Sequence, residues 1–455
     1  MSRFFSRFDK SYFILVPVVL YPTWPWLTYR LRPIIPFLLF CLWVVCQKKT
    51  NGMFFQKRMF SQMCMIAMVF FVLHTCLRNI FALFDHGQFF TYGEFATFLS
   101  AIIHFLIVHL SFKHMKFKEM EFLTIVALIG ISLAGIAAVR GGMIEGFEGG
   151  RLMTTATELI ENTDSFLDKR LAYQIGSANY GTTYGFAMFT VPLLWAIFKI
   201  KKLSVRLLLM ATLAAIVLTI KNSGLGTPVF VFLFGTVLIL STKIGLKSSG
   251  VKIIGIAAIV LLTVFAYKPQ IFSSLGSAVE MLSHVFPEGS SIHARCVSVS
   301  EAFSGDQSTY AYGRYQLQRR SFDVFLDHPM VGIGIYTVPH PKAYEVGGHS
   351  HLLDRLGQSG MIGGFLYFGF LIFLYLYYKQ MTLSFGFSRQ WLLVPLICIF
   401  TFIFSCIANP LPTFPVVLYY MVGLPLLALK YDHRNENIEF SHRGYPQSDY
   451  EMEIY

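Results

Sequence analysis

The chain has 455 residues, of which 55% are hydrophobic, 16% are aromatic and only 14% are charged. Soluble domains carry about 25% charged residues, so this composition excludes an ordinary soluble enzyme and predicts a membrane protein with many spans. The formal net charge of +12 is compatible with nucleic-acid binding or with charged membrane loops, and the distribution of the charges decides between them.

Apolar stretches of about 20 residues, long enough to cross a bilayer, recur from Tyr12 to Leu429. They predict an all-α fold, a polytopic transmembrane helical bundle of about twelve spans. The expected spans are 12–29, 33–46, 61–83, 95–112, 121–139, 179–198, 203–220, 226–242, 252–267, 361–379, 390–408 and 413–429. Prolines interrupt the first two spans, which are also compatible with a kinked hairpin.

The predicted organisation has four parts. Residues 1–267 hold spans one to nine, with an outer loop at 140–178, and residues 268–360 form a large extracytoplasmic loop. Residues 361–429 hold spans ten to twelve, and residues 430–455 form a polar cytoplasmic tail. Loops as long as 268–360 usually carry function or fold on themselves. Function is therefore expected in this loop.

The basic residues predict a topology rather than a nucleic-acid partner. With twelve spans, the lysine-rich connections such as 113–118 and 199–202 all fall on one side, together with both termini. The positive-inside rule makes that side cytoplasmic. We therefore expect a multi-pass protein of the cytoplasmic (inner) membrane, without a cleavable signal peptide, whose active site faces outward.

Six of the seven cysteines lie within expected spans, and only Cys296 lies in an outer loop. A single cysteine cannot close a disulfide within this loop, and no C-x-x-C spacing is present. The cysteines therefore predict neither a disulfide framework nor a structural metal.

The large loop contains the segment "GRYQLQRRSFDVFLDHP", residues 313–329, which reads as an amphipathic helix. Arg319 is spaced to pair with Asp323 at i,i+4, and Pro329 ends the pattern. A helix of this kind lies on the bilayer surface or covers a cavity. Residues 275–286 form a second and weaker amphipathic pattern.

The loop returns to the membrane through "GHSHLLDRLGQSGMIGG", residues 348–364. Ser350 is an expected N-cap of the tenth span, and Asp354 lies in its first turns, where the helix dipole favours a carboxylate. Gly357, Gly360 and Gly364 form a small-residue face that permits close helix packing in lipid. The segment therefore predicts a centrally packed helix with titratable groups at its outer end.

Ionisable residues at membrane depth are costly and are functional candidates by default. The candidates are cations expected at the outer ends of spans three, five and seven and on the amphipathic loop helix: Arg78, Arg140, Lys221 and Arg314. His74 lies one turn before the first of them, and His349 is expected at the same level. An alternative reading is that Arg78 and Arg140 extend to lipid phosphates without any further role.

Three landmarks in order resemble the O-antigen polymerase and ligase family of bacterial membrane glycosyltransferases. They are an asparagine-bearing segment at 176–195, an arginine, amphipathic helix, proline and glycine turn at 313–336, and the histidine segment at 348–364. The resemblance covers roughly residues 173–380. It departs from the family pattern where "KNSGLG" offers only Lys221, and where Gln358 stands in place of an acid.

The resemblance implies a C-type glycosyltransferase fold and transfer of a glycan from an undecaprenyl-diphosphate carrier at the outer face of the cytoplasmic membrane. It assigns His349 and Arg314 as catalytic residues and implies no metal and no cofactor. The expected partners are undecaprenyl-diphosphate-linked oligosaccharides, membrane lipids, a chain-length regulator and a flippase. The preferred function is a polymerase of O-antigen or capsular repeat units, with an O-antigen ligase as the alternative.

The chemistry of such a transfer predicts a role for each candidate. His349 acts as general base toward the acceptor hydroxyl, and Arg314 and Lys221, with Arg78 or Arg140, hold the diphosphate. Asp354 and His351 complete the expected substrate-binding set. Other readings stay open: each histidine is also compatible with a solvated loop or cap residue, and the His-Ser-His run with Asp354 is compatible with a metal site.

A transporter or flippase of lipid-linked sugars is a third alternative. Transporters are typically built from repeated halves whose broken helices meet near the bilayer midplane. Here the polar groups gather at one outer rim beside a single large loop, and no repeat relates the two halves of the chain. This asymmetry favours an enzyme.

Overall fold

The structure is a computed structural model. It describes residues 8–21, 34–46, 59–86, 102–111, 116–141, 166–200, 202–222, 226–243, 248–267, 273–274, 276–288, 291–304, 310–334, 346–347, 350–384 and 393–408. Within these residues every regular element is a helix and no strand occurs. The predicted all-α helical class is therefore confirmed.

The elements are a 3₁₀-helix and thirteen labelled α-helices in the described part of the chain. They are η1 (Lys10–Leu15), α2 (Val16–Leu20), α3 (Ile34–Cys46), α4 (Met59–His86), α6 (Phe117–Gly141), α8 (Phe166–Lys199), α9 (Leu203–Asn222), α10 (Gly226–Lys243), α11 (Ser248–Tyr267), α12 (Gly276–Ser283), α13 (Ser291–Ser304), α14 (Tyr310–Asp327), α15 (His351–Ser384) and α16 (Leu393–Ala408). An unlabelled apolar helix, Ile102–Ser111, lies between α4 and α6.

Three stretches are long and apolar enough to cross a membrane: Lys118–Ile136 in α6, Leu203–Lys221 in α9 and His351–Tyr377 in α15. Several shorter apolar helices, α3, α10 and α16 among them, coincide with other expected spans. One difference is α8, which begins at Phe166, inside the segment expected to be an outer loop. The span expected at 413–429 lies outside the described residues, so the number twelve stays a prediction.

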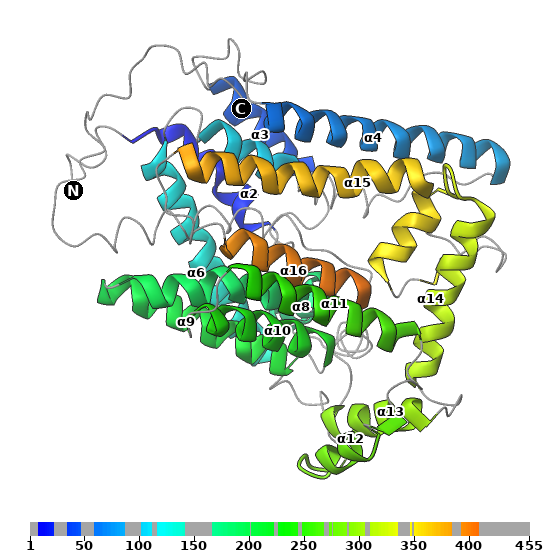
Figure 1. Cartoon of the computed structure of the whole chain (residues 1–455). Coiled ribbons are helices and arrows are strands. Elements are labelled where there is room, and N and C mark those ends of the chain that lie inside the picture. Colours follow the sequence, from blue (N-terminus) through cyan, green and yellow to red (C-terminus); the bar gives the residue numbers. More distant parts are fainter. Residues whose placement is uncertain are drawn as a thin grey trace.

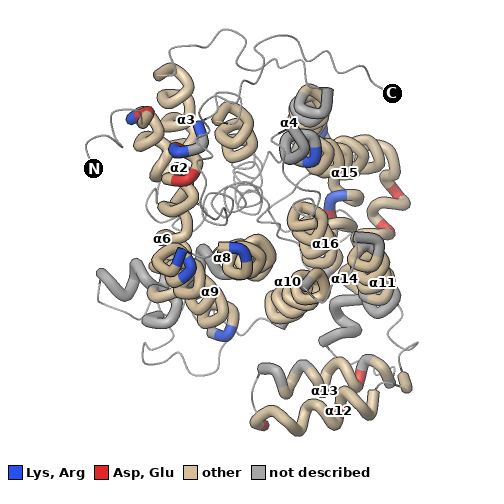
Figure 2. The backbone as a smooth tube through the Cα atoms, turned by 60° about the vertical axis from the view of Figure 1, so that its left-hand side comes forward, with Lys and Arg blue, Asp and Glu red and all other residues tan. Residues whose placement is uncertain are grey.

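The helices pack as a bundle with two neighbouring groups (Figure 1). Helix α4 packs along α15, while α6, α8 and α9 pack together and α16 contacts α8, α10 and α11. Most residues described along the helices are neither basic nor acidic (Figure 2). Charged groups are expensive in lipid, so their scarcity along the helices is what a membrane bundle requires.

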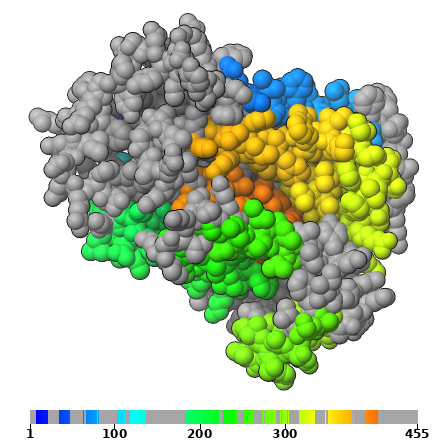
Figure 3. All heavy atoms as spheres, viewed as in Figure 1, coloured from blue at the N-terminus to red at the C-terminus, as the bar shows by residue number. Residues whose placement is uncertain are grey.

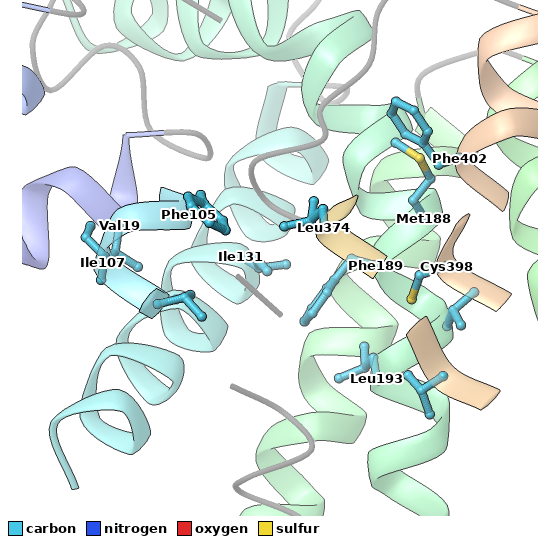
Figure 4. Close-up of a cluster of buried hydrophobic side chains, with 14 of the residues drawn as sticks. Val19, Phe105, Ile107, Ile131, Met188, Phe189, Leu193, Leu374, Cys398 and Phe402 are labelled. Atoms are coloured by element: carbon cyan, nitrogen blue, oxygen red, sulfur yellow. The ribbon is translucent and has the colours of Figure 1, made fainter. Parts of the chain in front are cut away.

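Apolar side chains lie both inside and outside this bundle. Figure 4 shows part of the buried core, where Phe189 of α8 and Cys398 of α16 are fully buried, as is Ile131 of α6. In contrast, Val45 is 76% exposed and Phe365 is 77% exposed. Apolar surface of this extent is unusual on a soluble protein and suits contact with lipid chains.

Close approach of the backbones compensates for the weak hydrophobic drive between helices in lipid. Helices α6 and α9 illustrate this, because a Cβ atom built on Gly135 would lie 2.4 Å from the Cβ of Ala215. Any larger side chain at position 135 would push the two helices apart. Tight packing of this kind fixes the bundle that carries the outer elements.

Helices α12, α13 and α14 belong to the segment expected to be the large loop, and α14 confirms that a helix forms where the amphipathic one was predicted. Its buried face includes the polar residues Gln318 and Ser321, whereas Leu326 is exposed. Helices α12 and α13 pack on each other and protrude from the bundle (Figure 3). Helix α14 instead packs against α15, near the end where α15 begins (Figure 1). The loop thus supplies a wall to one end of the bundle.

Candidate functional site

Helix α15 is broken at Gly360, where φ is 63° and ψ is −168°. A short turn that follows α14, residues 329–334, fills the break with backbone hydrogen bonds. The amide N–H groups of Met361 and Ile362 donate to the carbonyl oxygens of Pro329 (2.7 Å) and Met330 (3.1 Å). Breaking a helix normally leaves backbone groups unpaired, and here the turn pairs with them.

The same turn also donates in the opposite direction. The N–H of Ile333 donates to the carbonyl oxygen of Gly357 at 3.0 Å, and that of Gly334 donates to the carbonyl oxygen of Gln358 at 2.8 Å. Gly332 has a φ of 67°, and a Cβ there would lie 2.3 Å from the carbonyl carbon of Gln358. The turn and the broken helix are therefore interlocked through their backbones.

Arg78 of α4 holds this turn from the other side. Its Nε donates to the carbonyl oxygen of Gly332 at 2.7 Å, although the two residues are 254 positions apart in sequence. The guanidinium is partly buried. The guanidinium group carries five N–H donors, so it can bond to the turn and still donate to another group.

A pocket lies between α4, the turn and the first segment of α15, with an empty volume of about 220 Å³. It is lined by Phe71, His74, Thr75, Arg78, Gly334, Arg355, Gln358 and Ser359. The four residues from α4 follow helical spacing, and so do the three from α15, so one face of each helix meets the pocket. This volume includes open solvent, so the enclosed space is smaller still and admits only a small group.

The chemistry of the lining favours an anion. Arg78 and Arg355 bring two positive charges to the pocket, and Thr75, Ser359 and Gln358 add hydroxyl and amide donors. Arginine binds phosphate and carboxylate through two parallel N–H bonds, and partial burial strengthens each bond. No acidic side chain is among the described residues that line it.

The first segment of α15 is fixed by a buried polar network. Asp354 is 5% exposed, and its Oδ1 accepts a 2.6 Å hydrogen bond from the Ser321 hydroxyl of α14. Its Oδ2 accepts from the backbone N–H of Ser350 at 3.3 Å. The Ser321 oxygen in turn accepts from the N–H of Gly347 at 2.8 Å. These bonds connect α14, the end of the loop and α15.

Ser350 confirms the predicted N-cap, because its hydroxyl oxygen accepts from the N–H of Leu353 at 3.5 Å. The same hydroxyl donates to the carbonyl oxygen of Cys406 at 3.3 Å, and Gln318 of α14 donates to that of Ile407 at 3.4 Å. Both carbonyls lie in the last turn of α16, where they lack partners within the helix. The first turn of α15, the last turn of α16 and the middle of α14 therefore meet.

His351 is the first residue of α15 and is 2% exposed. Its Nε2 lies 2.9 Å from the hydroxyl oxygen of Tyr367, and the two ring centroids are 5.5 Å apart. Tyr367 also contacts the ring of Phe71, which lines the pocket, with centroids 5.4 Å apart. The histidine is thus a buried, hydrogen-bonded group behind the pocket.

The structure describes the predicted site residues unequally. It places Arg78 in the pocket and places His351 and Asp354 in buried networks beside it. Lys221 is exposed at the end of α9, a helix that packs on α6 and α8. Arg140 belongs to α6 and Arg314 to α14, but their side chains lie outside the described part of the structure, as does the whole of His349.

Arg355 was not among the predicted site residues, yet it lines the pocket with Arg78. Its position did carry a signal, because it stands four residues after His351 and four before Ser359, on one face of a helix. Its partner across the pocket comes from a distant helix. That pairing depends on tertiary structure and has no local pattern.

These features define a helical membrane protein with a small pocket, lined by two arginines, between α4 and α15. Residues 207–368 match the family model described as O-Antigen ligase. This match agrees with the resemblance to the O-antigen polymerase and ligase family and supports a function of that glycosyltransferase-like type. No curated protein matches the chain.

Proposed function

We propose that this protein transfers a glycan from an undecaprenyl-diphosphate carrier at the outer face of the cytoplasmic membrane, as a polymerase of O-antigen or capsular repeat units. The observation that supports it best is the pocket that Arg78 and Arg355 share at the break of α15. A membrane protein has few other reasons to place two arginines around one small cavity.

Release of the diphosphate is the step that this pocket serves. When the bond between the sugar and the carrier breaks, negative charge grows on the departing diphosphate. Preorganised cations and N–H donors stabilise that charge most strongly in a partly buried site. Arg78 and Arg355 supply the charge, and Gln358 supplies an amide donor at the same place.

The pocket is too small for an oligosaccharide, so the sugar of the donor lies outside it. The polyprenyl chain lies in the bilayer beside the apolar helices. We retain His349 as the general base that removes the proton of the acceptor hydroxyl, since it directly precedes Ser350, the N-cap of α15. General base catalysis accelerates a reaction by roughly 10²–10⁴-fold.

Arg314, Lys221 and Arg140 complete the proposed donor site. Arg314 lies on α14, the helix that packs against α15, so its helix is adjacent to the pocket. Lys221 would have to reach the donor from the end of α9, where its side chain is exposed. A long, flexible lysine at the rim suits a contact with a phosphate that extends beyond the pocket.

An O-antigen ligase is the second candidate function, and the description of the matching family model favours it. A ligase moves a finished glycan to an acceptor such as lipid A core and needs the same diphosphate site. The two functions differ in the acceptor, which is another lipid-linked repeat unit in the polymerase.

Reconstitution of the purified chain in liposomes with a lipid-linked repeat unit tests the proposal. A ladder of polymer lengths supports the polymerase, and one transfer to an added lipid A core supports the ligase. Substrate that stays chemically unaltered in the presence of both acceptors contradicts glycosyl transfer and leaves the transporter alternative.

Two substitutions test the site within that assay. Arg355→Ala should reduce turnover by removing a diphosphate ligand, whereas Arg319→Ala, on the exposed face of α14, should leave turnover unchanged. His349→Ala should reduce turnover by roughly 10²–10⁴-fold at normal protein level. Normal polymer from the His349 variant would remove its assignment as the base.

A further inference from the structure

His74 is a half-buried residue whose ring nitrogens differ from those of the buried histidines His109 and His351. Both of its ring nitrogens are buried, and neither has a hydrogen-bond partner among the described residues. His351 and His109, in contrast, each have a ring nitrogen beside a tyrosine hydroxyl, at 2.9 Å from Tyr367 and 2.6 Å from Tyr377. A buried polar group without a partner is uncommon in native proteins and calls for an explanation.

The place of His74 supplies that explanation. It lies on α4 one turn before Arg78, and both residues line the pocket together with Arg355. Its ring is closely fitted, because a Cβ built on Gly363 of α15 would lie 3.0 Å from the Cε1 of His74. Glycine at 363 therefore leaves the room that the imidazole occupies.

The chemistry of the ring restricts the partner. An imidazole has at least one N–H donor in either protonation state. The ring N–H therefore suits an acceptor, and the two guanidinium groups beside it disfavour a cation and favour an acceptor that carries negative charge. Phosphoryl oxygens combine that charge with several acceptor positions.

We propose that His74 is a further ligand-binding residue of the pocket, and that its ring N–H donates to a phosphoryl oxygen held by Arg78 and Arg355. This inference rests on the proposed function, in which the pocket binds the diphosphate of the donor. It adds a second polar residue of α4, a helix outside the segment that matches the family model, to the donor site.

Binding of inorganic pyrophosphate to the purified full-length chain tests the inference by calorimetry. His74→Phe keeps an aromatic ring and removes the donor, so it should weaken pyrophosphate binding by roughly 10- to 100-fold, the value of a hydrogen bond to a charged group. His74→Gln retains an N–H donor and should recover part of the affinity. Arg319→Ala, at an exposed position outside the pocket lining, should bind as the wild type does.

Comparison with Arg355→Ala distinguishes the role of His74 from the role of the pocket as a whole. If Arg355→Ala weakens binding and His74→Phe does not, the inference about His74 is wrong and the proposed donor pocket stands. If neither substitution weakens binding, the pocket is not the pyrophosphate site and the proposed function loses its main support.

If His74→Phe fails to fold, a measurement on the wild-type protein still tests the inference. In ¹⁵N-histidine-labelled wild-type protein, pyrophosphate should shift one imidazole signal, which is assigned by its loss in His74→Gln. Pyrophosphate binding that leaves this signal unmoved overturns the inference.

Discussion

Substitution of Gly360 by alanine tests whether the break in α15 is required by the fold. Its φ of 63° and ψ of −168° lie in a region that is essentially restricted to glycine. A Cβ there would also lie 2.4 Å from the carbonyl carbon of Met330, in the turn that fills the break. The strain costs about 1–3 kcal/mol and the overlap about the same, so Gly360→Ala should destabilise the protein by roughly 2–6 kcal/mol.

Gly369→Ala, in the same helix, is the matched control. A Cβ at 369 would meet its nearest neighbour, Phe373 of the same helix, at 3.8 Å, which is ordinary contact. Alanine in an unbroken helix is favoured over glycine by about 0.5–1 kcal/mol. Gly369→Ala should therefore be as stable as the wild type or slightly more stable.

Thermal unfolding of the two variants in detergent compares their stabilities, and pyrophosphate binding compares their pockets. Gly360→Ala should lower both, because residue 360 joins the segment that carries Arg355 to the rest of α15. If Gly360→Ala unfolds at the same temperature as Gly369→Ala and binds pyrophosphate equally well, the break is not needed and the account of the turn is incorrect.

Three further predictions concern the loop helices. Ser321→Ala removes the 2.6 Å hydrogen bond to the buried carboxylate of Asp354 and should destabilise the protein by about 1–3 kcal/mol in chemical denaturation; an unchanged midpoint would argue against the network. Arg319→Ala breaks an exposed pair with Asp323 and should change stability by no more than about 1 kcal/mol in the same assay; a larger loss would show that α14 depends on its outer face. Burial raises the pKa of the Cys296 thiol, so its thiolate fraction at a given pH is below that of a free cysteine; alkylation followed by peptide mass mapping should still accelerate at pH values where a model thiol has levelled off, and an identical pH profile would contradict this.

Local sequence patterns were sufficient to predict most of the described fold. Apolar stretches of helical length predicted α6, α9 and α16, because lipid imposes hydropathy on each span separately. The cap at Ser350 was predictable for the same reason, since an N-cap depends on residues within one turn. These features need no information about distant parts of the chain.

The break at Gly360 shows where such patterns stop. The glycine spacing in this segment predicted a small-residue packing face. Gly357 does pack closely, because a Cβ built on it would lie 3.1 Å from the carbonyl oxygen of Ser321. Gly360 instead adopts a positive φ because the turn at 329–334 supplies replacement hydrogen bonds. That exchange depends on two segments meeting in space.

The pocket was predictable only in part for the same reason. Arg78 could be chosen because a charge at the end of an apolar span is costly wherever it lies. Arg355 directly follows Asp354 in a segment with several polar residues. A basic residue is common in such a segment, so the sequence did not mark it as a site residue. Only the packing of α4 along α15 makes the two arginines neighbours.

The bond from Arg78 to the Gly332 carbonyl has a consequence for how this protein can be divided and recombined. Half of the residues that line the pocket come from α4, which lies outside the segment that matches the family model. A chimera that exchanges residues 207–368 between relatives would pair a foreign loop with the resident α4. Grafts that transplant α4 together with the loop should keep their donor's specificity, and grafts of the loop alone should be inactive.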